Sequence, residues 1–301
     1  MRRIPRLSST FAALLVLSVA SASAFAVTLQ DYARDHPLTL FIATKGAVMP
    51  TAIDQTNNLQ EGDRALLLSG LDLTDLTGLS ELTVDDAGQK RPITEVAHLH
   101  LFLNRNRIES LPEELGRLKQ VKFLYLEFNR LQTLPLALRQ MDALEGMYFT
   151  SNRFTTVPPF VYTMRKLKKL QFSRNQLSEL PPEIGHLTEL RHLNLSGNRI
   201  ATVPATIGRL TRLRVCDLSD NQISELPTEF GQVKIVNQLR VRNNPLTTLP
   251  EGFADMRATI DITGTKIDPA KLSPGLRARI GTEKPPGSKP DGKIIVRSPA
   301  K

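Results

Sequence analysis

The sequence predicts an α/β solenoid, a right-handed curved horseshoe with a parallel β-sheet on its concave face and irregular turns or short helices on its convex side. Three observations predict this fold. A unit of 23 residues recurs seven times between residues 98 and 257. Every unit carries one Asn and one Leu-Pro or Val-Pro step at fixed positions, and most units open on a short apolar alternation such as Leu-x-Leu. Such regularity over seven units indicates stacked copies of one structural element.

Each unit is expected to begin with a short strand, as in Leu193-Asn194-Leu195. The alternation turns two apolar side chains inward and the residue between them outward. One such strand cannot bury its own apolar face, so each unit must stack on the next.

The repeated Asn is expected to turn the chain out of the strand while its side chain stays inside. Its amide can bond the backbone of its own and the neighbouring turn, which predicts a buried ladder, because an unpaired buried amide costs roughly 1–3 kcal/mol. The ladder residues are Asn106, Asn129, Asn152, Asn175, Asn198, Asn221 and Asn244.

Residues 1–26 are typical of an export signal. Arg2, Arg3 and Arg6 form a basic start, Phe11–Ala20 is apolar, and two small-residue cleavage sites end at Ala24 and Ala26. The apolar stretch is shorter than the about 20 residues that a bilayer requires. We therefore expect an exported protein, periplasmic or secreted and not membrane-spanning; an uncleaved anchor is the alternative.

Residues 27–97 are expected to form an N-terminal capping region. Residues 28–34 fit a short helix, 37–42 a short strand, and 66–76 a degenerate first repeat. The step from Leu66 to Leu101 is one repeat plus 12 residues, and the polar segment 85–92 can hold this insertion.

The repeat domain is expected to span residues 98–267, with seven full repeats and a shortened eighth around Ile260–Ile262. Residues 268–301 are expected to form a C-terminal cap, with a short helix within 269–280, and a disordered basic tail over 282–301.

The net charge of +9 is concentrated at the two ends of the chain. The signal contributes +3 and residues 268–301 contribute +5, which leaves about +1 for the horseshoe. Nucleic acid is not an expected partner, because no basic stripe interleaves with aromatic residues on the repeats. The single cysteine, Cys216, takes a core Leu position and forms no disulfide framework.

The outward positions of the first three repeats are aromatic. Neighbouring strands lie about 4.8 Å apart, so these positions form a continuous column. The sequence predicts an exposed aromatic patch for binding a ligand, made of Phe102, Phe123, Tyr125, Phe128 and Tyr148. In the alternative, the N-terminal cap or the insertion at 85–92 folds over these rings and they belong to the core.

The outward positions of the last repeats are polar and are expected to add specificity to the same binding surface. These candidate ligand-binding residues are Asn194, Asp217, Asp220, Arg240 and Arg242.

No catalytic motif is found, and neither a catalytic residue nor a cofactor is expected. His98 and His100 alternate along one strand, so His98 is expected in the core and His100 on the concave face. His100 and His192 share a column but lie four strands apart, about 19 Å, too far to hold one metal ion. Carboxylates such as Asp217 and Asp220 are interpreted as a solvated acidic spot rather than a metal site.

The pattern L-x-x-L-x-L-x-x-N-x-L-x-x-L-P-x-x-L-G-x-L, nearly complete over Leu190–Leu210, resembles the typical 23-residue leucine-rich repeat. It is most similar to the repeats of Ras-suppressor-type proteins and of many bacterial proteins, and it lacks the G-x-I-P step of the plant extracellular type. The resemblance covers about 170 residues and implies a scaffold that binds many unrelated partners.

These observations predict a non-enzymatic, exported protein-binding module that holds a macromolecular partner of unknown identity on its concave face. Two alternatives stay open. The aromatic patch also suits a cell-wall glycan, because flat rings stack on sugars, and the chain also suits an inhibitor or accessory subunit of an enzyme. The oligomeric state is not predicted.

Overall fold

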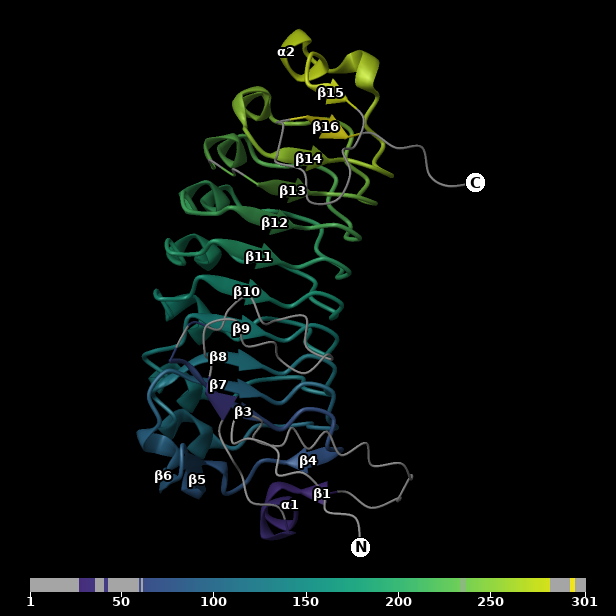
Figure 1. The fold of residues 1–301 in the computed structure, drawn as a ribbon. Helices are drawn as coiled ribbons and strands as arrows, with labels where there is room; N and C mark the ends of the chain where they lie inside the picture. The colour runs from purple at the N-terminus through teal and green to yellow at the C-terminus, as the bar shows by residue number, and fades with distance from the viewer. Residues whose placement is uncertain are drawn as a thin grey trace, which may run out of the picture.

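The computed structural model describes residues 27–35, 41–42, 60, 62–233, 235, 237–281 and 293–295. Their strands stack one above another as a ladder of parallel arrows (Figure 1). Within these residues one sheet has twelve strands, in the order β15-β16-β14-β13-β12-β11-β10-β9-β8-β7-β3-β2. All neighbours in it are parallel except β2 and β3. The predicted solenoid with a parallel sheet is confirmed.

Each repeat contributes one strand to this sheet. The repeat strands are β7 (Leu99–Phe102), β8 (Val121–Tyr125), β9 (Gly146–Tyr148), β10 (Lys169–Gln171), β11 (His192–Asn194), β12 (Val215–Asp217), β13 (Gln238–Arg240) and β14 (Thr259–Asp261). Residues 23 apart are paired in register from β8 to β13, as Leu170 with Leu193 and Leu193 with Cys216. The spacing in the sequence therefore becomes contact in space.

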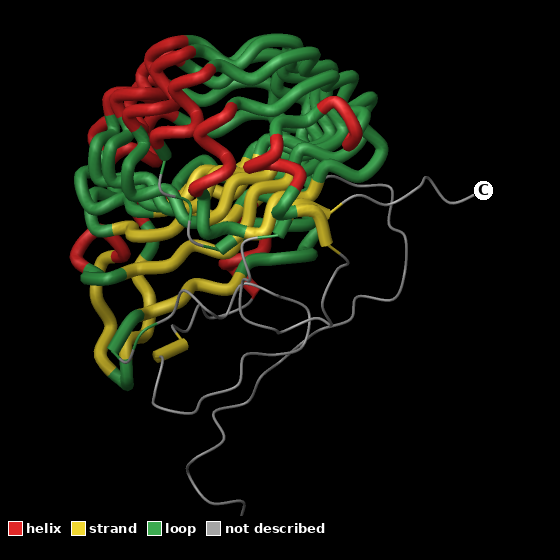
Figure 2. The backbone as a smooth tube through the Cα atoms, turned by 90° about the horizontal axis from the view of Figure 1, so that it is seen from above, coloured by secondary structure: helices red, strands yellow, loops and turns green. Residues whose placement is uncertain are grey.

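A short 3-10 turn follows the Leu-Pro or Val-Pro step of every repeat. These turns are η4 (Glu113–Arg117), η5 (Leu136–Gln140), η6 (Pro159–Thr163), η7 (Pro182–His186), η8 (Ala205–Arg209), η9 (Thr228–Gln232) and η10 (Glu251–Asp255). The Pro fixes φ just before each turn, near −72° at Pro112. A Cβ on Gly116 would lie 2.3 Å from the carbonyl oxygen of Ala137, so glycine allows neighbouring turns to approach. Seen along the stack, the strands form the inner layer and the turns and loops lie outside it (Figure 2).

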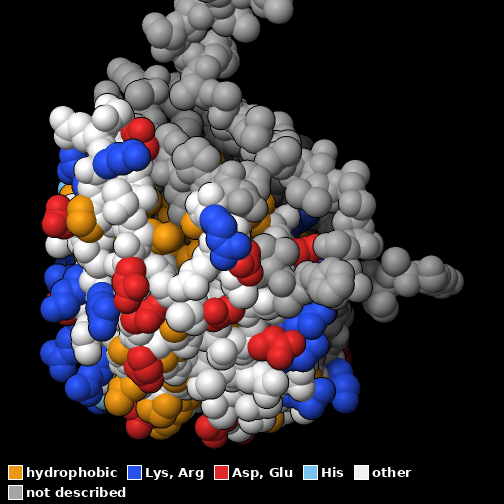
Figure 3. Space-filling model, turned by 90° about the horizontal axis from the view of Figure 1, so that it is seen from below, with side chains coloured by type: hydrophobic (Ala, Val, Ile, Leu, Met, Phe, Trp, Pro, Cys, Tyr) orange, Lys and Arg blue, Asp and Glu red, His pale blue; other side chains and the backbone are white. Residues whose placement is uncertain are grey.

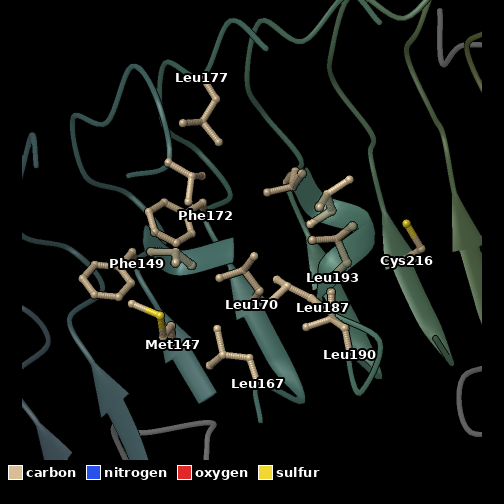
Figure 4. Packing of buried hydrophobic residues seen from close by; sticks show 14 of the residues in the cluster. Met147, Phe149, Leu167, Leu170, Phe172, Leu177, Leu187, Leu190, Leu193 and Cys216 are labelled. Carbon is tan, nitrogen blue, oxygen red and sulfur yellow. The ribbon is translucent and has the colours of Figure 1, made fainter. Parts of the chain in front are cut away.

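The main core lies between the sheet and these outer turns. Leu170, Leu193 and Cys216 point to the same side of successive strands and are at most 1% exposed (Figure 4). Cys216 is a free, buried thiol, as its position in the repeat predicts. Burial of apolar side chains at roughly 25 cal/mol per Å² is the main force that joins each repeat to the next.

The N-terminal region is built as the sequence predicts in outline. Its elements are β1 (Val27–Thr28), α1 (Leu29–Asp35), β2 (Phe41–Ile42), β3 (Arg64–Leu67), β4 (Leu73–Asp75), η2 (Leu79–Glu81), β5 (Thr83–Asp86), β6 (Gln89–Pro92) and η3 (Ile93–Glu95). Strand β3 is the degenerate first repeat and pairs in parallel with β7. The insertion is an antiparallel hairpin of β5 and β6. The expected export signal, residues 1–26, lies outside the described residues.

The C-terminal end contains η11 (Pro269–Lys271), α2 (Pro274–Arg277), β15 (Ile280–Gly281) and β16 (Ile294–Ile295). Strand β16 lies between β14 and β15, and Ile294 and Ile295 are 0% and 5% exposed. The prediction of disorder over 282–301 is therefore wrong for these two residues, because the open edge of β14 offers backbone partners and an apolar surface. The other tail residues, apart from Lys293, lie outside the described part of the chain.

Candidate functional site on the concave face

The seven repeated asparagines lie inside the solenoid, each between 2% and 8% exposed. The Asn175 side-chain amide donates to the carbonyl oxygens of Phe149 and Phe172 at 2.9 and 3.0 Å, and its Oδ1 accepts from the amide of Phe154 at 3.1 Å. The other six bond their neighbours in the same way. The ladder thus holds each strand end to the previous repeat and keeps the concave columns in register.

The residue before each ladder Asn has a left-handed backbone. Its φ is 58° at Arg105, 57° at Phe128, 51° at Arg174 and 68° at Gly197. This conformation is unusual for a residue with a Cβ, and it is maintained by the hydrogen bonds on both sides. These left-handed residues lie just after the ends of the strands, at the edge of the concave face.

The aromatic rings of the first repeats are buried, which corrects the prediction of an exposed patch. Phe102, Tyr125 and Tyr148 are 0%, 0% and 1% exposed, and Phe123 is 6% exposed. The rings of Phe102 and Tyr125 stack at 4.2 Å and those of Tyr125 and Tyr148 at 4.6 Å.

These four rings and Ala65 of β3 form a second apolar cluster, separate from the main core, with Leu67 packed against it. Stacking at strand spacing removes the ring faces from water, and Ala65 and Leu67 of β3 pack against the same rings. The alternative in which the rings belong to a core thus agrees with their burial. The hairpin β5–β6 is not part of this cluster.

Gly146 makes room for this ring cluster. A Cβ at this position would lie 2.4 Å from Cδ1 of Phe123, much closer than atoms can approach. The Phe123 ring therefore lies over the backbone of β9, where any larger residue would displace it.

Phe128 is the one predicted aromatic residue that is exposed, at 47%. The guanidinium of Arg105 lies over its ring, 5.5 Å from the centroid. This is a cation–π contact between adjacent repeats at the strand ends.

A buried aspartate, Asp63, lies beside the ring cluster in contact with His100 and Lys122. The sequence analysis did not predict this contact. His100 is 0% exposed, its Nε2 lies 3.0 Å from Oδ2 of Asp63, and its ring stacks on Phe123 at 4.7 Å. Nζ of Lys122 donates to Oδ1 of Asp63 at 3.2 Å. Burial lowers the pKa of His100 to about 4, against the opposing attraction of Asp63. The imidazole is therefore neutral at neutral pH, and Asp63 balances Lys122.

The neighbouring His98 is exposed, with φ of 55°, so its predicted core position is wrong. The chain turns at His98 before β7 begins, and the alternation of the strand does not extend to it. Farther along the same face, Glu127 is 6% exposed, and burial raises the pKa of its carboxyl to about 7.

The predicted polar residues of the later repeats are half-buried or exposed and mostly paired. Nη1 of Arg240 lies 3.4 Å from Asp217, and Nε of Arg242 lies 3.6 Å from Asp261. Asp220 accepts a hydrogen bond of 2.7 Å from Asn243. The structure thus brings Asp217 and Arg240 together, as adjacent positions of one column.

Asn194 lies one strand earlier in that column and bonds within its own repeat. Its Oδ1 accepts from the amide and the hydroxyl of Ser196 at 3.1 and 2.8 Å. Its Cα pairs with those of Gln171 on one side and Asp217 on the other. Asn194 therefore belongs to the same face as Asp217 and Arg240, several strands from the ring cluster.

Basic residues lie at the starts of β10 to β12, and the sequence analysis did not include them among the candidate binding residues. They are Lys168, Lys169, Arg191, His192 and Arg214. The signal that would find them is a basic residue directly before three successive strands. Burial, with help from Lys169, Arg214 and Arg191, lowers the pKa of His192 to about 4.

Among the described residues, no group of three or more His, Cys, Asp or Glu side chains could hold a metal ion. Within the same ranges, no helix is long and apolar enough to cross a membrane.

Comparison with known proteins agrees with this geometry. Two family models match, one for a leucine-rich repeat region over residues 181–272 and one for leucine-rich repeats over residues 142–200. No curated protein matches the sequence.

Similar solved structures come from bacteria and a plant. A leucine-rich repeat protein of Leptospira interrogans is 26% identical, with a TM-score of 0.54 over 66% of this chain and 54% of that one. The ectodomain of the Arabidopsis thaliana receptor kinase GASSHO1/SCHENGEN3, solved in complex with CASPARIAN STRIP INTEGRITY FACTOR 2, is 30% identical, with a TM-score of 0.55 over 66% of this chain and 27% of that one. Internalin C2 of Listeria monocytogenes, 19% identical with a TM-score of 0.51 over 69% of this chain and 80% of its own, shares the fold. The chain spans about half of the Leptospira protein and about a quarter of the plant ectodomain.

The fold and the asparagine ladder show that the chain is a repeat solenoid, and the matched family models identify the type of repeat. The chain is a leucine-rich repeat protein, as its sequence pattern indicates. Domains of this family typically mediate protein–protein interactions and are generally non-enzymatic.

Proposed function

We propose that this chain binds a protein partner on the concave face of β10 to β13, and that it does so without enzymatic activity. The observation that carries the proposal is the change in burial along the sheet. The outward residues of β10 to β13 are half-buried, whereas every residue of β7 and β9 is buried. The partly exposed columns supply a rigid surface whose polar groups a partner can contact.

The composition of that surface suits a protein. Gln171, Asn194, Asp217 and Arg240 are successive members of one column, with an amide, an amide, a carboxylate and a guanidinium. Such groups give directional hydrogen bonds at defined positions, and the sheet holds them in place before binding. The complex formed by the Arabidopsis ectodomain supports a binding role for the same fold.

The glycan alternative depends on exposed rings. Of the five aromatic residues predicted to form a binding patch, only Phe128 has an exposed ring, and the Arg105 guanidinium lies over that ring. The observations therefore favour the polar columns and a protein partner.

Site-specific photo-crosslinking tests this proposal. A photoreactive amino acid placed at Gln171 or Asn194 is expected to crosslink one discrete partner in cells. The same amino acid at Ser178 or Ser224, which are exposed outside the strands, serves as the control. Equal crosslinking from all four positions, or none from Gln171 and Asn194, would contradict the proposal.

We propose further that the chain is exported. The support is the sequence pattern of residues 1–26, and one of the similar structures is a receptor ectodomain. Fractionation of cells that express the full chain, with mass spectrometry of the mature N-terminus, tests this. Export predicts a chain that begins after Ala24 or Ala26, outside the cytoplasm; an intact Met1 in the cytoplasm contradicts it.

A further inference from the structure

The starts of β10, β11 and β12 place three basic residues in one column. The amide of Arg191 donates to the carbonyl oxygen of Lys168, and the amide of Arg214 donates to that of Arg191, both at 2.8 Å. Lys168, Arg191 and Arg214 are therefore neighbours at about one strand spacing, 4.8 Å. With His192, which follows Arg191 in β11, they are called the strand-start cluster below.

Other basic residues in and near this cluster have acidic partners. Within the cluster, Lys168 lies 2.9 Å from Glu145, and the nearby Arg212 is paired with Glu189. Farther along the sheet, Arg240 and Arg242 are paired with aspartates.

Arg191 and Arg214 differ from these paired basic residues. Within the described part of the chain, neither guanidinium has an acidic or hydrogen-bonding partner, although Arg191 is half-buried and Arg214 exposed. Among the residues that the structure describes, these two positive charges are therefore uncompensated, and like charges on adjacent strands repel one another.

The surroundings show the effect of this charge. The lowered pKa of His192 has Lys169, Arg214 and Arg191 among its causes, after burial. A neutral imidazole therefore lies among cations. In the space-filling view from below, several Lys and Arg side chains gather along the left edge of the molecule (Figure 3).

We propose that the strand-start cluster binds an acidic segment of the protein partner, with its carboxylates on Arg191 and Arg214. This inference rests on the proposed function and names the chemistry of the partner. An arginine can hold a carboxylate through two parallel hydrogen bonds, which a lysine cannot do. The amides of Gln171 and Asn194, at the other ends of β10 and β11, then lie along the path of the bound segment.

The charges nearby favour an acidic peptide over a uniform polyanion. Asp217, on β12, and Glu145, at the edge of β9, flank the cluster on the same sheet. A nucleic acid or a phospholipid surface would present negative charge to these carboxylates as well. A peptide can place acidic residues at Arg191 and Arg214 and neutral or basic residues elsewhere.

The test compares two double variants with the same change in charge. The first is Arg191→Gln with Arg214→Gln; the control is Arg153→Gln with Arg199→Gln, two exposed arginines after ladder asparagines, also without a partner in the described ranges. The probe is a short fluorescein-labelled oligoglutamate peptide, and binding is measured by fluorescence anisotropy at low ionic strength. The native chain and the control are expected to bind equally, and the cluster variant roughly tenfold more weakly.

Three results would overturn the inference. The first is equal binding by both variants. The second is absence of binding by the native chain. The third is tighter binding to phosphatidylserine vesicles than to oligoglutamate, lost in the same cluster variant. Thermal unfolding of each variant checks that the fold is kept, and removal of mutually repelling charges is expected to leave it unchanged or slightly more stable.

The crosslinking experiment separates this inference from the proposed function. If Asn194 crosslinks a partner equally well in the native chain and in the Arg191/Arg214 variant, concave binding stands and the acidic-segment inference fails. If crosslinking from Asn194 falls in the variant and is kept in the control, both are supported.

Discussion

The two halves of the concave sheet use the same backbone for different purposes. On β7 to β9 the outward column is Phe102, Tyr125 and Tyr148, and the rings are buried against one another. On β10 to β13 the same column is Gln171, Asn194, Asp217 and Arg240, all partly exposed. The strands pair in the same register in both halves, so the halves differ in the side chains that they carry and in the residues of β3 that pack against the rings.

This comparison shows that a side chain on the concave side of the sheet is not necessarily available for binding. Apolar rings at strand spacing pack into a second core, whereas polar groups at the same spacing keep their contact with water. The buried rings of the N-terminal half contribute stability, and the proposed recognition is assigned to the C-terminal half.

The largest effect is expected from removing two stacked rings. Tyr125→Ala with Tyr148→Ala should lower the free energy of unfolding by about 3–5 kcal/mol for each ring, as for other buried aromatics. The matched change Gln171→Ala, on the same column in the other half, should alter it by less than about 0.5 kcal/mol. Chemical denaturation followed by circular dichroism measures both. A Tyr double variant as stable as the native chain would show that these rings are surface.

The next effect concerns the ladder that both halves share. Asn175→Ala leaves the carbonyls of Phe149 and Phe172 and the amide of Phe154 without their side-chain partner. The expected loss is about 3 kcal/mol, because several buried polar groups lose hydrogen bonds at once. Ser178→Ala, at an exposed position of the same repeat, is the control. Equal stability of the two variants in the same denaturation assay would contradict a structural ladder.

A smaller effect is expected where the ring cluster meets the backbone. Gly146→Ala would place a Cβ 2.4 Å from Phe123, so the ring must move, at a cost of about 1–3 kcal/mol. Gly275→Ala is the matched control, because its nearest neighbour would be the Ala254 Cβ at 3.4 Å, an ordinary contact. Differential scanning calorimetry should show a lower melting temperature for the first variant only. A lowered melting temperature for both would indicate a general intolerance of larger side chains.

The 23-residue period of the sequence predicted the structural features that repeat with it. Register between strands, inward leucines and the Cys216 position all follow from contacts between residues 23 apart, which the sequence displays directly. The first repeat at β3 and the hairpin at 83–92 could also be located, since an insertion of fixed length interrupts the period.

Features that depend on residues outside the period could not be predicted in this way. The contact of His100 with Asp63 and the insertion of Ile294 beside β14 each join segments whose separation is not a multiple of the repeat. The basic residues Arg191 and Arg214 are periodic, but only the folded structure shows that the acids nearby are paired with other basic residues and that, within the described ranges, neither arginine has an acidic partner.

The effect that is smallest at neutral pH is a dependence of stability on pH that originates in the buried half of the sheet. The pKa of His100 is about 4 in the fold against 6.5 for an ordinary histidine, so between these values the unfolded chain binds more protons than the folded one. The contribution of His100 to stability is therefore complete above pH 6.5 and falls as the pH decreases toward 4, with a loss of about 2 kcal/mol at pH 5. His100→Gln should flatten this dependence, and His186→Gln, at an exposed position, should leave it as it is. Urea denaturation at a series of pH values measures the slope. An unchanged slope in His100→Gln would mean that another buried group, such as His192 with its pKa of about 4, dominates, and the buried half would then not be the one that senses pH.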